Sequence, residues 1–205
     1  MRLRYKQWAV DYLSEHPEVI VDKVDFNDAF LKKTISLEIG SGKGEFITSY
    51  AAMHQDENFL AIERVPTIAG ILTKKVVESE LHNVRIFPHD GEALLNDIPD
   101  DSVDKIFLNF VDPWPKKKHA KRRLTYHKFL EEYYRILKPN GLVIFKSDND
   151  SLYESSQEEI ALTKFVVLTN EEDYKFDQAN DALTGYEEKF RGLGHHIHRL
   201  ILKKE

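Results

Sequence analysis

The sequence predicts an α/β fold in which a doubly wound, mostly parallel sheet has helices on both faces. Short apolar runs alternate with segments of helical periodicity, and a glycine-rich turn directly follows the first run. With 205 residues and 41% hydrophobic content, the chain can bury one substantial core. We therefore expect a single domain over residues 1–205, in which residues 1–30 form an N-terminal extension.

Seven apolar runs are the expected strands. The first two, TISLEI and NFLAI, are typical of parallel strands that are buried on both faces. In chain order, the expected strands are residues 34–39, 58–62, 84–87, 103–110, 142–147, 165–169 and 196–202.

Helices are expected between these runs. Apolar residues at helical spacing mark residues 46–51, and Pro66 suits the first turn of a second helix. Thr125 is a candidate N-cap for a helix that Lys-Pro-Asn-Gly at 138–141 ends, and residues 151–163 form a further candidate helix. In such a sheet ligands bind outside the carboxyl ends of the strands, so the residues that follow each strand are the candidate site.

Composition excludes several classes of protein. The absence of cysteine rules out a disulfide framework, a thiolate zinc site and a cysteine nucleophile. The opening MRLRYKQWAVDYL has neither a signal-peptide core nor a membrane-spanning run, so we expect a cytoplasmic protein. Net charge is −6, yet six Lys and Arg residues lie within residues 116–123. A cationic strip on an acidic chain is suited to docking a polyanion.

The exits of the first three strands suggest a nucleotide-like cofactor. Glu38-Ile-Gly-Ser-Gly-Lys-Gly44 places three glycines at alternate positions, which allows a tight turn and close approach of a ligand, although the pattern is not a P-loop. Glu63 follows the second strand, where an acid can accept from ribose hydroxyls, and Asp90 follows the third. These features suit NAD and S-adenosylmethionine alike. Glu38 would repel a pyrophosphate and attract a cationic amino acid, which favours S-adenosylmethionine.

The exit of the fourth strand has the sequence Asp112-Pro-Trp-Pro-Lys116. The two prolines fix φ and disfavour helix, so this turn should be stiff. We expect the Asp112 carboxylate close to the cofactor crevice. Trp114 either stacks on a base or packs at the edge of the sheet, and packing is the commoner role.

Several motifs together resemble the bacterial tRNA (guanine-N7)-methyltransferase family. They are EIGSGKGEF, HDGE, DPWPKKKHAKRRLTYHKFL, FKSDN and TGYEEKF, and the similarity runs through essentially the whole chain. The resemblance implies a class I, Rossmann-like methyltransferase with a seven-stranded sheet. It implies S-adenosylmethionine as methyl donor, S-adenosylhomocysteine as product, and 7-methylguanosine formation at guanosine 46 in the tRNA variable loop. The N-terminal extension is then expected to be mobile without RNA, and the enzyme to be a monomer or a homodimer.

The resemblance also assigns roles residue by residue, with no metal ligand among them. Asp112 is the expected catalytic residue. The expected cofactor-binding residues are Glu38, Gly40, Gly42, Glu63, Asp90 and Asp112. The expected substrate-binding residues are Lys116, Asp148, Thr184, Gly185, Tyr186 and Glu187. The expected RNA contacts are Lys118, His119, Lys121, Arg122 and Arg123.

The chemistry expected of such a site is undemanding. Guanine N7 carries no proton at neutral pH, so no general base is needed to uncover it. The product ring is cationic, and a nearby anion would stabilise the charge as it develops. We expect Asp112 to supply that anion or to hold the guanine edge, and Asp148 to accept from guanine N1–H or N2–H₂. Arg122 and Arg123 are expected to bind phosphates bidentately.

Three other functions remain open on the residues alone. A nicotinamide oxidoreductase fits the glycine turn and Glu63, although it leaves the basic strip unused. A non-catalytic RNA-binding module fits the strip, but it does not need acids at four strand exits. An amine methyltransferase fits because Asp112-Pro-Trp resembles the Asp-Pro-Pro-Tyr turn of adenine-N6 enzymes. Histidine-based metal chemistry is the weakest alternative, because the histidines of residues 195–198 lack the acidic or thiol partners typical of zinc sites.

Overall fold

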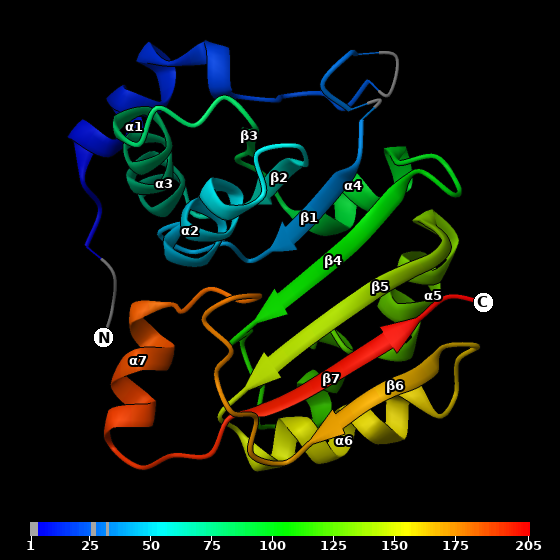
Figure 1. Cartoon of the computed structure of the whole chain (residues 1–205). Helices are drawn as coiled ribbons and strands as arrows, with labels where there is room; N and C mark the ends of the chain where they lie inside the picture. The colour runs from blue at the N-terminus through cyan, green and yellow to red at the C-terminus, as the bar shows by residue number, and fades with distance from the viewer. Residues whose placement is uncertain (1–3, 26–27, 32) are drawn as a thin grey trace. The chain divides into compact units, whose positions relative to one another are not determined.

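The computed structural model describes residues 4–25, 28–31 and 33–205, and the chain divides after Asp97 into two compact units. Its seven strands have the order β3-β2-β1-β4-β5-β7-β6 (Figure 1). Strand β1 pairs in parallel with β2, β2 with β3 and β4 with β5, whereas β7 is antiparallel to both β5 and β6. The predicted α/β fold with a mostly parallel sheet is confirmed.

The first unit contains the three strands whose exits carry the glycine turn, Glu63 and Asp90. All residues of β1 and β2 are buried, as expected for parallel strands covered on both faces. Its elements are α1 (Gln7–Glu15), a 3₁₀ turn (Pro17–Val19), β1 (Ile35–Ile39), α2 (Glu45–Met53), β2 (Asn58–Ile62), α3 (Pro66–Glu78), β3 (Val84–Phe87) and α4 (Gly91–Asp97).

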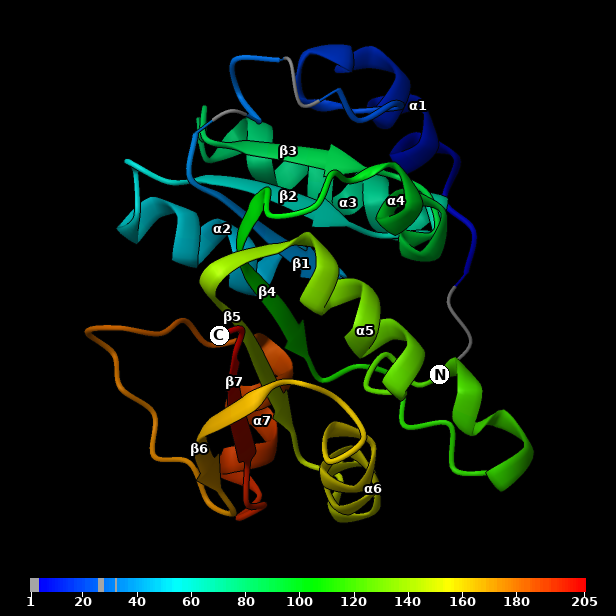
Figure 2. The same cartoon turned by 90° about the vertical axis from the view of Figure 1, so that its right-hand side faces the viewer.

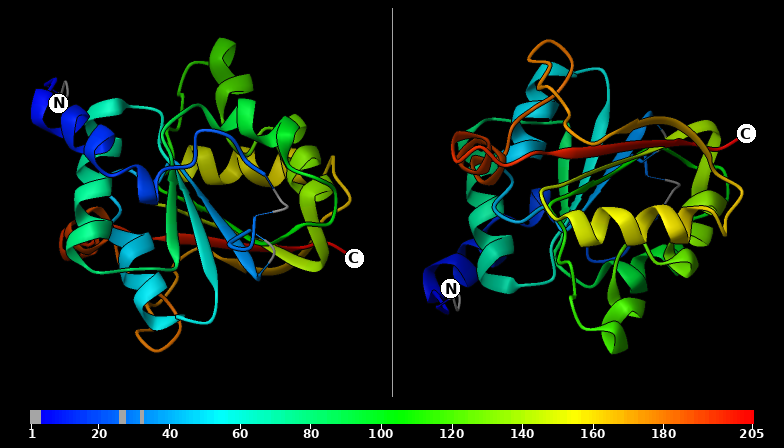
Figure 3. Two further views of the ribbon diagram at one scale, coloured as in Figure 1. Left: turned by 90° about the horizontal axis from the view of Figure 1, so that it is seen from above. Right: turned by 90° about the horizontal axis from the view of Figure 1, so that it is seen from below.

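The N-terminal segment packs on the rest of the first unit. Helix α1 lies along α3 (Figure 3), and the approach is so close that a Cβ on Gly70 would lie 1.8 Å from the carbonyl oxygen of Ala9. Ile20 forms a parallel bridge with Ile86 of β3. Residues 1–3 and 26–27 of the proposed extension lie outside the described residues, and its mobility without RNA stays a prediction.

The second unit carries the fourth and fifth strand exits. Helices α5 and α6 both contact β5 and lie on the same side of the strands of this unit (Figure 2), while α7 stands at the carboxyl ends of β4 and β5 (Figure 1). Its elements are β4 (Val103–Asn109), a 3₁₀ helix (Lys117–Arg122), α5 (His127–Ile136), β5 (Leu137–Ser147), α6 (Asp150–Ile160), β6 (Val166–Glu171), α7 (Gly185–Gly192) and β7 (His198–Lys203).

Two local expectations were wrong. Thr125 does not cap α5, whose N-cap is Tyr126; the Thr125 hydroxyl is buried and accepts a hydrogen bond from Ser156 Oγ at 2.7 Å. Strand β5 begins at Leu137 and not at residue 142, and it includes residues 138–141 as an irregularity in its pairing with β4; the helix before them ends at Ile136, as expected. Helices α1, α4 and α7 were not expected.

Candidate functional site

The glycine turn after β1 is held to the end of β2. Gly40 and Ser41 donate their backbone N–H groups to the carbonyl of Ile62 at 2.9 and 3.0 Å. The Ser41 hydroxyl donates to the Glu38 carbonyl at 2.9 Å and accepts from the Ile62 N–H at 3.2 Å. The turn is therefore built by backbone and hydroxyl groups, and its shape does not depend on a ligand.

Glu63 joins this turn to the start of α3. One carboxylate oxygen accepts from the Gly42 N–H at 3.0 Å, and the other accepts from the Val65 N–H at 2.9 Å. The predicted ribose acid thus also fixes the loop beside it.

The glycines of the turn leave space that a ligand can enter. Gly40 and Gly42 have φ of +80° and +55°, and a Cβ placed on either would meet nothing within 4 Å. Gly44 also has positive φ, but a Cβ there would lie 2.2 Å from Leu72 Cδ1, so this position faces α3 and is not open. Only the first two positions combine a left-handed backbone with open space, as a cofactor cradle requires.

The remaining acids of the first unit differ in exposure. Glu38 is 2% exposed within β1. Asp90 is exposed; it accepts from the Glu92 N–H at 3.0 Å at the start of α4 and lies 3.5 Å from Arg64. Asp90 also lines a cavity of about 620 Å³ whose other walls include Leu13 and Pro17. All predicted donor residues except Asp112 belong to this unit, and the role of Asp112 there stays a prediction.

The turn after β4 is strained around Asp112. Phe110 and Trp114 have φ of +51° and +41°, which bulky residues rarely adopt. The Phe110 N–H donates to the Lys146 carbonyl at 2.9 Å, which anchors the entry of the turn to β5. Asp112 is exposed between the two strained residues. Such strain persists only where surrounding contacts enforce it, and it is common at functional sites.

Arginines of the basic strip hold this turn. Arg123 donates from Nε to the Pro113 carbonyl at 3.0 Å and from Nη2 to the Trp114 carbonyl at 3.2 Å. The Arg122 guanidinium lies 5.0 Å from the centre of the Trp114 ring, and His119 meets the same ring edge-on at 5.8 Å. Bidentate binding of phosphate by Arg123 stays a prediction, and its guanidinium bonds the backbone of the turn. The exposed lysines of the strip are Lys116, Lys117, Lys118 and Lys121.

An aromatic cluster stands at the exit of β5. The Tyr186 hydroxyl donates to Asp148 Oδ2 at 3.0 Å. The Tyr186 ring is 44% exposed, stacks on Phe190 at 4.2 Å between centroids, and lies 5.2 Å from Phe110. Burial, with the nearby Asp148 charge, raises the pKa of Tyr186 to about 12, so its hydroxyl is a donor at neutral pH. Two residues predicted to bind substrate are thus in direct contact.

Of the other predicted residues of this stretch, Gly185 is exposed, whereas Thr184 and Glu187 form hydrogen bonds within the protein. Thr184 caps the helix, because its hydroxyl accepts from the Glu187 N–H at 2.8 Å. Glu187 is fully buried and contacts Lys146 of β5. Lys146 was not predicted as a site residue, although a lysine inside the apolar run LVIFKS is an unusual residue for a buried strand. The pattern Thr-x-x-Glu at 184–187 is likewise a capping-box signal for a helix start.

Within residues 4–25, 28–31 and 33–205, no helix is long and apolar enough to cross a membrane. In the same ranges, no group of three or more His, Cys, Asp or Glu side chains could hold a metal ion.

Comparison with known proteins gives similar sequences and similar folds. Residues 32–200 match the family model described as "Putative methyltransferase". The tRNA (guanine-N(7)-)-methyltransferase of Staphylococcus carnosus is 41% identical, with 99% of each chain covered. The protein of the same name from Mesoplasma florum is 39% identical, covering 100% of this chain and 99% of the relative.

Solved structures share the fold at low sequence identity. An antibiotic-related methyltransferase has a TM-score of 0.59 at 13% identity, covering 100% of this chain and 96% of that one. An rRNA methylase from Streptococcus thermophilus has a TM-score of 0.54 at 14% identity, with 100% and 98% covered. At this level of identity the likeness concerns the fold alone.

Proposed function

Because this chain belongs to the tRNA (guanine-N7)-methyltransferase family, we propose that it transfers a methyl group from S-adenosylmethionine to N7 of a guanosine in tRNA. The observation that carries this proposal is the match of the whole chain, at about 40% identity, to relatives of that name. We further propose guanosine 46 of the variable loop as the target. A cytoplasmic location and a monomeric or homodimeric state stay predictions.

The first unit provides a suitable donor site. Its open positions at Gly40 and Gly42 leave room for a ligand against the backbone, and we assign the Glu63 carboxylate, which holds the Gly42 and Val65 N–H groups beside this space, to the ribose hydroxyls. Asp90, which is exposed and lines a cavity, is proposed to accept from an adenine amino group. S-adenosylmethionine, when bound, supplies a methyl group activated by positively charged sulfur. The buried Glu38 carboxylate favours that cationic ligand over a dinucleotide.

The second unit provides groups that suit a guanine. Asp148 uses Oδ2 to accept from Tyr186, which leaves Oδ1 for guanine N1–H or N2–H₂. The exposed Tyr186 ring, supported by Phe190, offers a flat surface on which a base can stack. The negative charge of Asp112 stabilises the positive charge that develops on the guanine during methyl transfer. N7 has no proton to remove, so no side chain is required as a general base.

The basic strip supports capture of the RNA backbone. Lys116, Lys117, Lys118 and Lys121 are exposed point charges on a chain of net charge −6. Phosphate contacts release condensed counterions, so tRNA affinity should fall with salt by a log–log slope of roughly 0.7 to 0.9 per contact. Arg122 and Arg123 are proposed to act mainly by shaping the turn that carries Asp112.

Incubation with labelled S-adenosylmethionine and bulk unmodified tRNA tests the function. Nucleoside analysis should show 7-methylguanosine as the labelled product. A label on an exocyclic amine would favour the amine methyltransferase instead, and preferential binding of NADH would favour the oxidoreductase. Asp112→Ala should abolish labelling while donor affinity is retained; loss of both would place Asp112 in donor binding rather than beside the base.

A further inference from the structure

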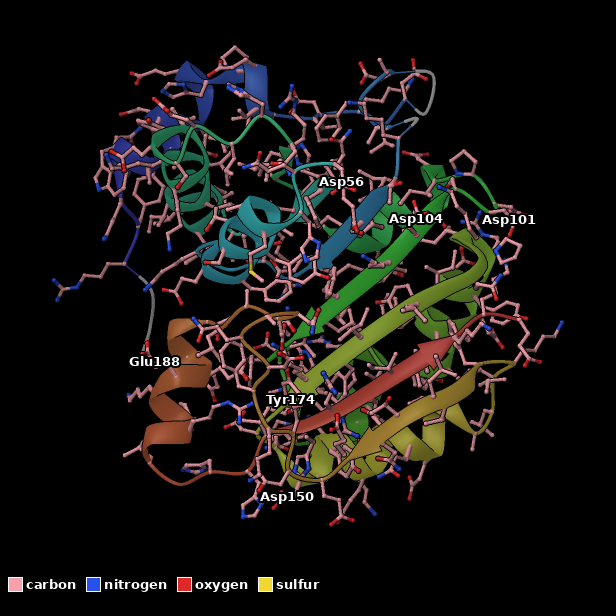
Figure 4. The ribbon with its side chains drawn as sticks, viewed as in Figure 1. Asp56, Asp101, Asp104, Asp150, Tyr174 and Glu188 are labelled. Atoms are coloured by element: carbon pink, nitrogen blue, oxygen red, sulfur yellow. The ribbon has the colours of Figure 1, made fainter. Side chains whose placement is uncertain are left out.

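A buried cluster of charges lies behind the aromatic cluster of the second unit. The Lys146 side chain is 1% exposed, and its Nζ lies 2.9 Å from Asp181 Oδ2 and 3.0 Å from Glu187 Oε2. Arg191 contacts the other Glu187 oxygen, with Nη2 to Oε1 at 2.7 Å. Two cations and two anions therefore balance one another. The Tyr174 hydroxyl adds a bond to Asp181 at 3.0 Å (Figure 4).

This cluster joins three segments that are distant in sequence. Lys146 belongs to β5, Asp181 to the loop before α7, and Glu187 to α7 itself. Burying charges is costly, and well-packed apolar residues would stabilise the same place equally well or better. We therefore explain this buried ion-pair cluster by its effect on geometry: it fixes how the three segments lie against one another. It is not explained by a gain in stability.

The geometry specified here is that of the proposed guanine site. Lys146 precedes Asp148 by two residues at the exit of β5, and Glu187 directly follows Tyr186 in α7. The Lys146–Glu187 contact therefore links the two segments that present Asp148 and Tyr186. Because Glu187 is fully buried with both oxygens engaged, contact with RNA would require the cluster to open.

We propose that Lys146 is a positioning residue for methyl transfer, which holds Glu187 and thereby sets Tyr186 against Asp148. Glu187 is then the buried partner of Lys146 and does not contact the substrate. This inference rests on the proposed function, since it concerns how the substrate is held.

The test compares Lys146→Met, Glu187→Gln and the double variant. Each single variant leaves the buried charges unbalanced and should unfold at lower urea concentration than the parent. The double variant is balanced again, with Asp181 and Arg191 remaining, and should recover much of that loss. Its kcat/KM for tRNA should nevertheless stay between about tenfold and 100-fold low, as expected for misplacement of a substrate group. Its affinity for S-adenosylhomocysteine should be unchanged, because the proposed donor residues of the first unit are untouched.

A mutant cycle that combines Tyr186→Phe with the double variant shows whether the loss of kcat/KM acts through Tyr186. If Lys146 acts through the Tyr186–Asp148 bond, adding Tyr186→Phe to the double variant should lower kcat/KM less than it does in the parent. The proposal is overturned if the effects of Tyr186→Phe and of the double variant on kcat/KM are additive. It is also overturned if the double variant has the kcat/KM of the parent. Should that variant not fold, Glu187→Gln, which keeps the shape of the side chain, is taken through the same cycle.

Glu188→Gln is the matched control. Glu188 is the neighbouring acid of α7, is exposed, and lies on the outer side of the helix (Figure 4). The kcat/KM of Glu188→Gln for tRNA should equal that of the parent. If Glu187→Gln and Glu188→Gln lose kcat/KM equally, Glu187 has no specific role. An inactive parent protein would instead contradict the proposed function, so the two failures are distinguishable.

Discussion

Tyr186 donates its hydroxyl proton to Asp148 at 3.0 Å and so joins the first turn of α7 to the exit of β5. The bond orients the carboxylate and occupies one of its two oxygens. It also holds the exposed Tyr186 ring, which stacks on Phe190, in one position. The Asp148 carboxylate and the Tyr186 ring are thus fixed relative to each other before a base binds. This preorganisation lowers the entropy cost of binding.

Tyr186→Phe should weaken catalysis without unfolding the protein. The variant keeps the stacking ring but loses the bond that orients Asp148, and hydrogen bonds to charged groups contribute about 1.5 to 3 kcal/mol. We expect kcat/KM for tRNA to fall by about tenfold or more. Tyr134→Phe is the control, because its hydroxyl donates at 3.2 Å to the Glu205 carbonyl. Equal activities in the two variants would contradict a substrate role for the Tyr186 hydroxyl.

Gly42→Ala should reduce affinity for the donor. Its φ of +55° costs an alanine roughly 1 to 2 kcal/mol, and the new methyl group would project into the open space beside the loop. Calorimetric titration with S-adenosylhomocysteine should show a Kd raised about tenfold or more. Gly192→Ala has equally open surroundings without a positive φ and should bind normally. If Gly42→Ala binds S-adenosylhomocysteine as tightly as the parent, the glycine turn is not part of the donor site.

Substitutions in the basic strip should separate RNA capture from the shape of the turn. Lys117→Gln removes an exposed charge, so the salt dependence of tRNA binding should lose roughly 0.7 to 0.9 in log–log slope. Arg123→Lys keeps the charge but cannot reproduce the two bonds to the Pro113 and Trp114 carbonyls. It should retain the slope while kcat falls, by about tenfold.

The exposed Lys128 of α5 lies outside the strip and provides the control for these two variants. Lys128→Gln should change neither the slope nor kcat. A parental kcat in Arg123→Lys would show that the two bonds to the Pro113 and Trp114 carbonyls do not shape the turn for catalysis.

Tyr174 should make stability depend on pH in the alkaline range. Burial raises its pKa to about 12, against an ordinary value of 10.0. Between these values the folded state holds a proton that the unfolded state has lost, so this contribution is complete below pH 10 and is lost as pH rises toward 12. Urea unfolding should show the parent losing about 2 to 3 kcal/mol more than Tyr174→Phe across this range. Parallel curves for the two proteins would refute the shift.

Local sequence was sufficient for the strands of the first unit and for the glycine turn that follows the first of them. The apolar runs of β1, β2 and β3 agree with the expected strands to within one residue, because continuous burial leaves a clear pattern. The glycine turn and Glu63 were predicted, and Gly42 and Glu63 are in direct contact. Short helices such as α4 and α7 were missed, because seven or eight residues carry little periodicity.

The amino-acid sequence by itself determined the α/β class, the acids and glycines at the strand exits and the family. Tertiary structure alone decided how Lys146, Arg123 and Glu187 are used. Arg123 was expected to contact RNA, Glu187 was expected to bind substrate and Lys146 had no predicted role, yet each bonds within the protein. Motifs specify which residue types are present, but the partner of a charge depends on which distant segments fold against it. The pairing of Lys146 with Glu187, 41 residues apart, leaves no periodic signal in the chain.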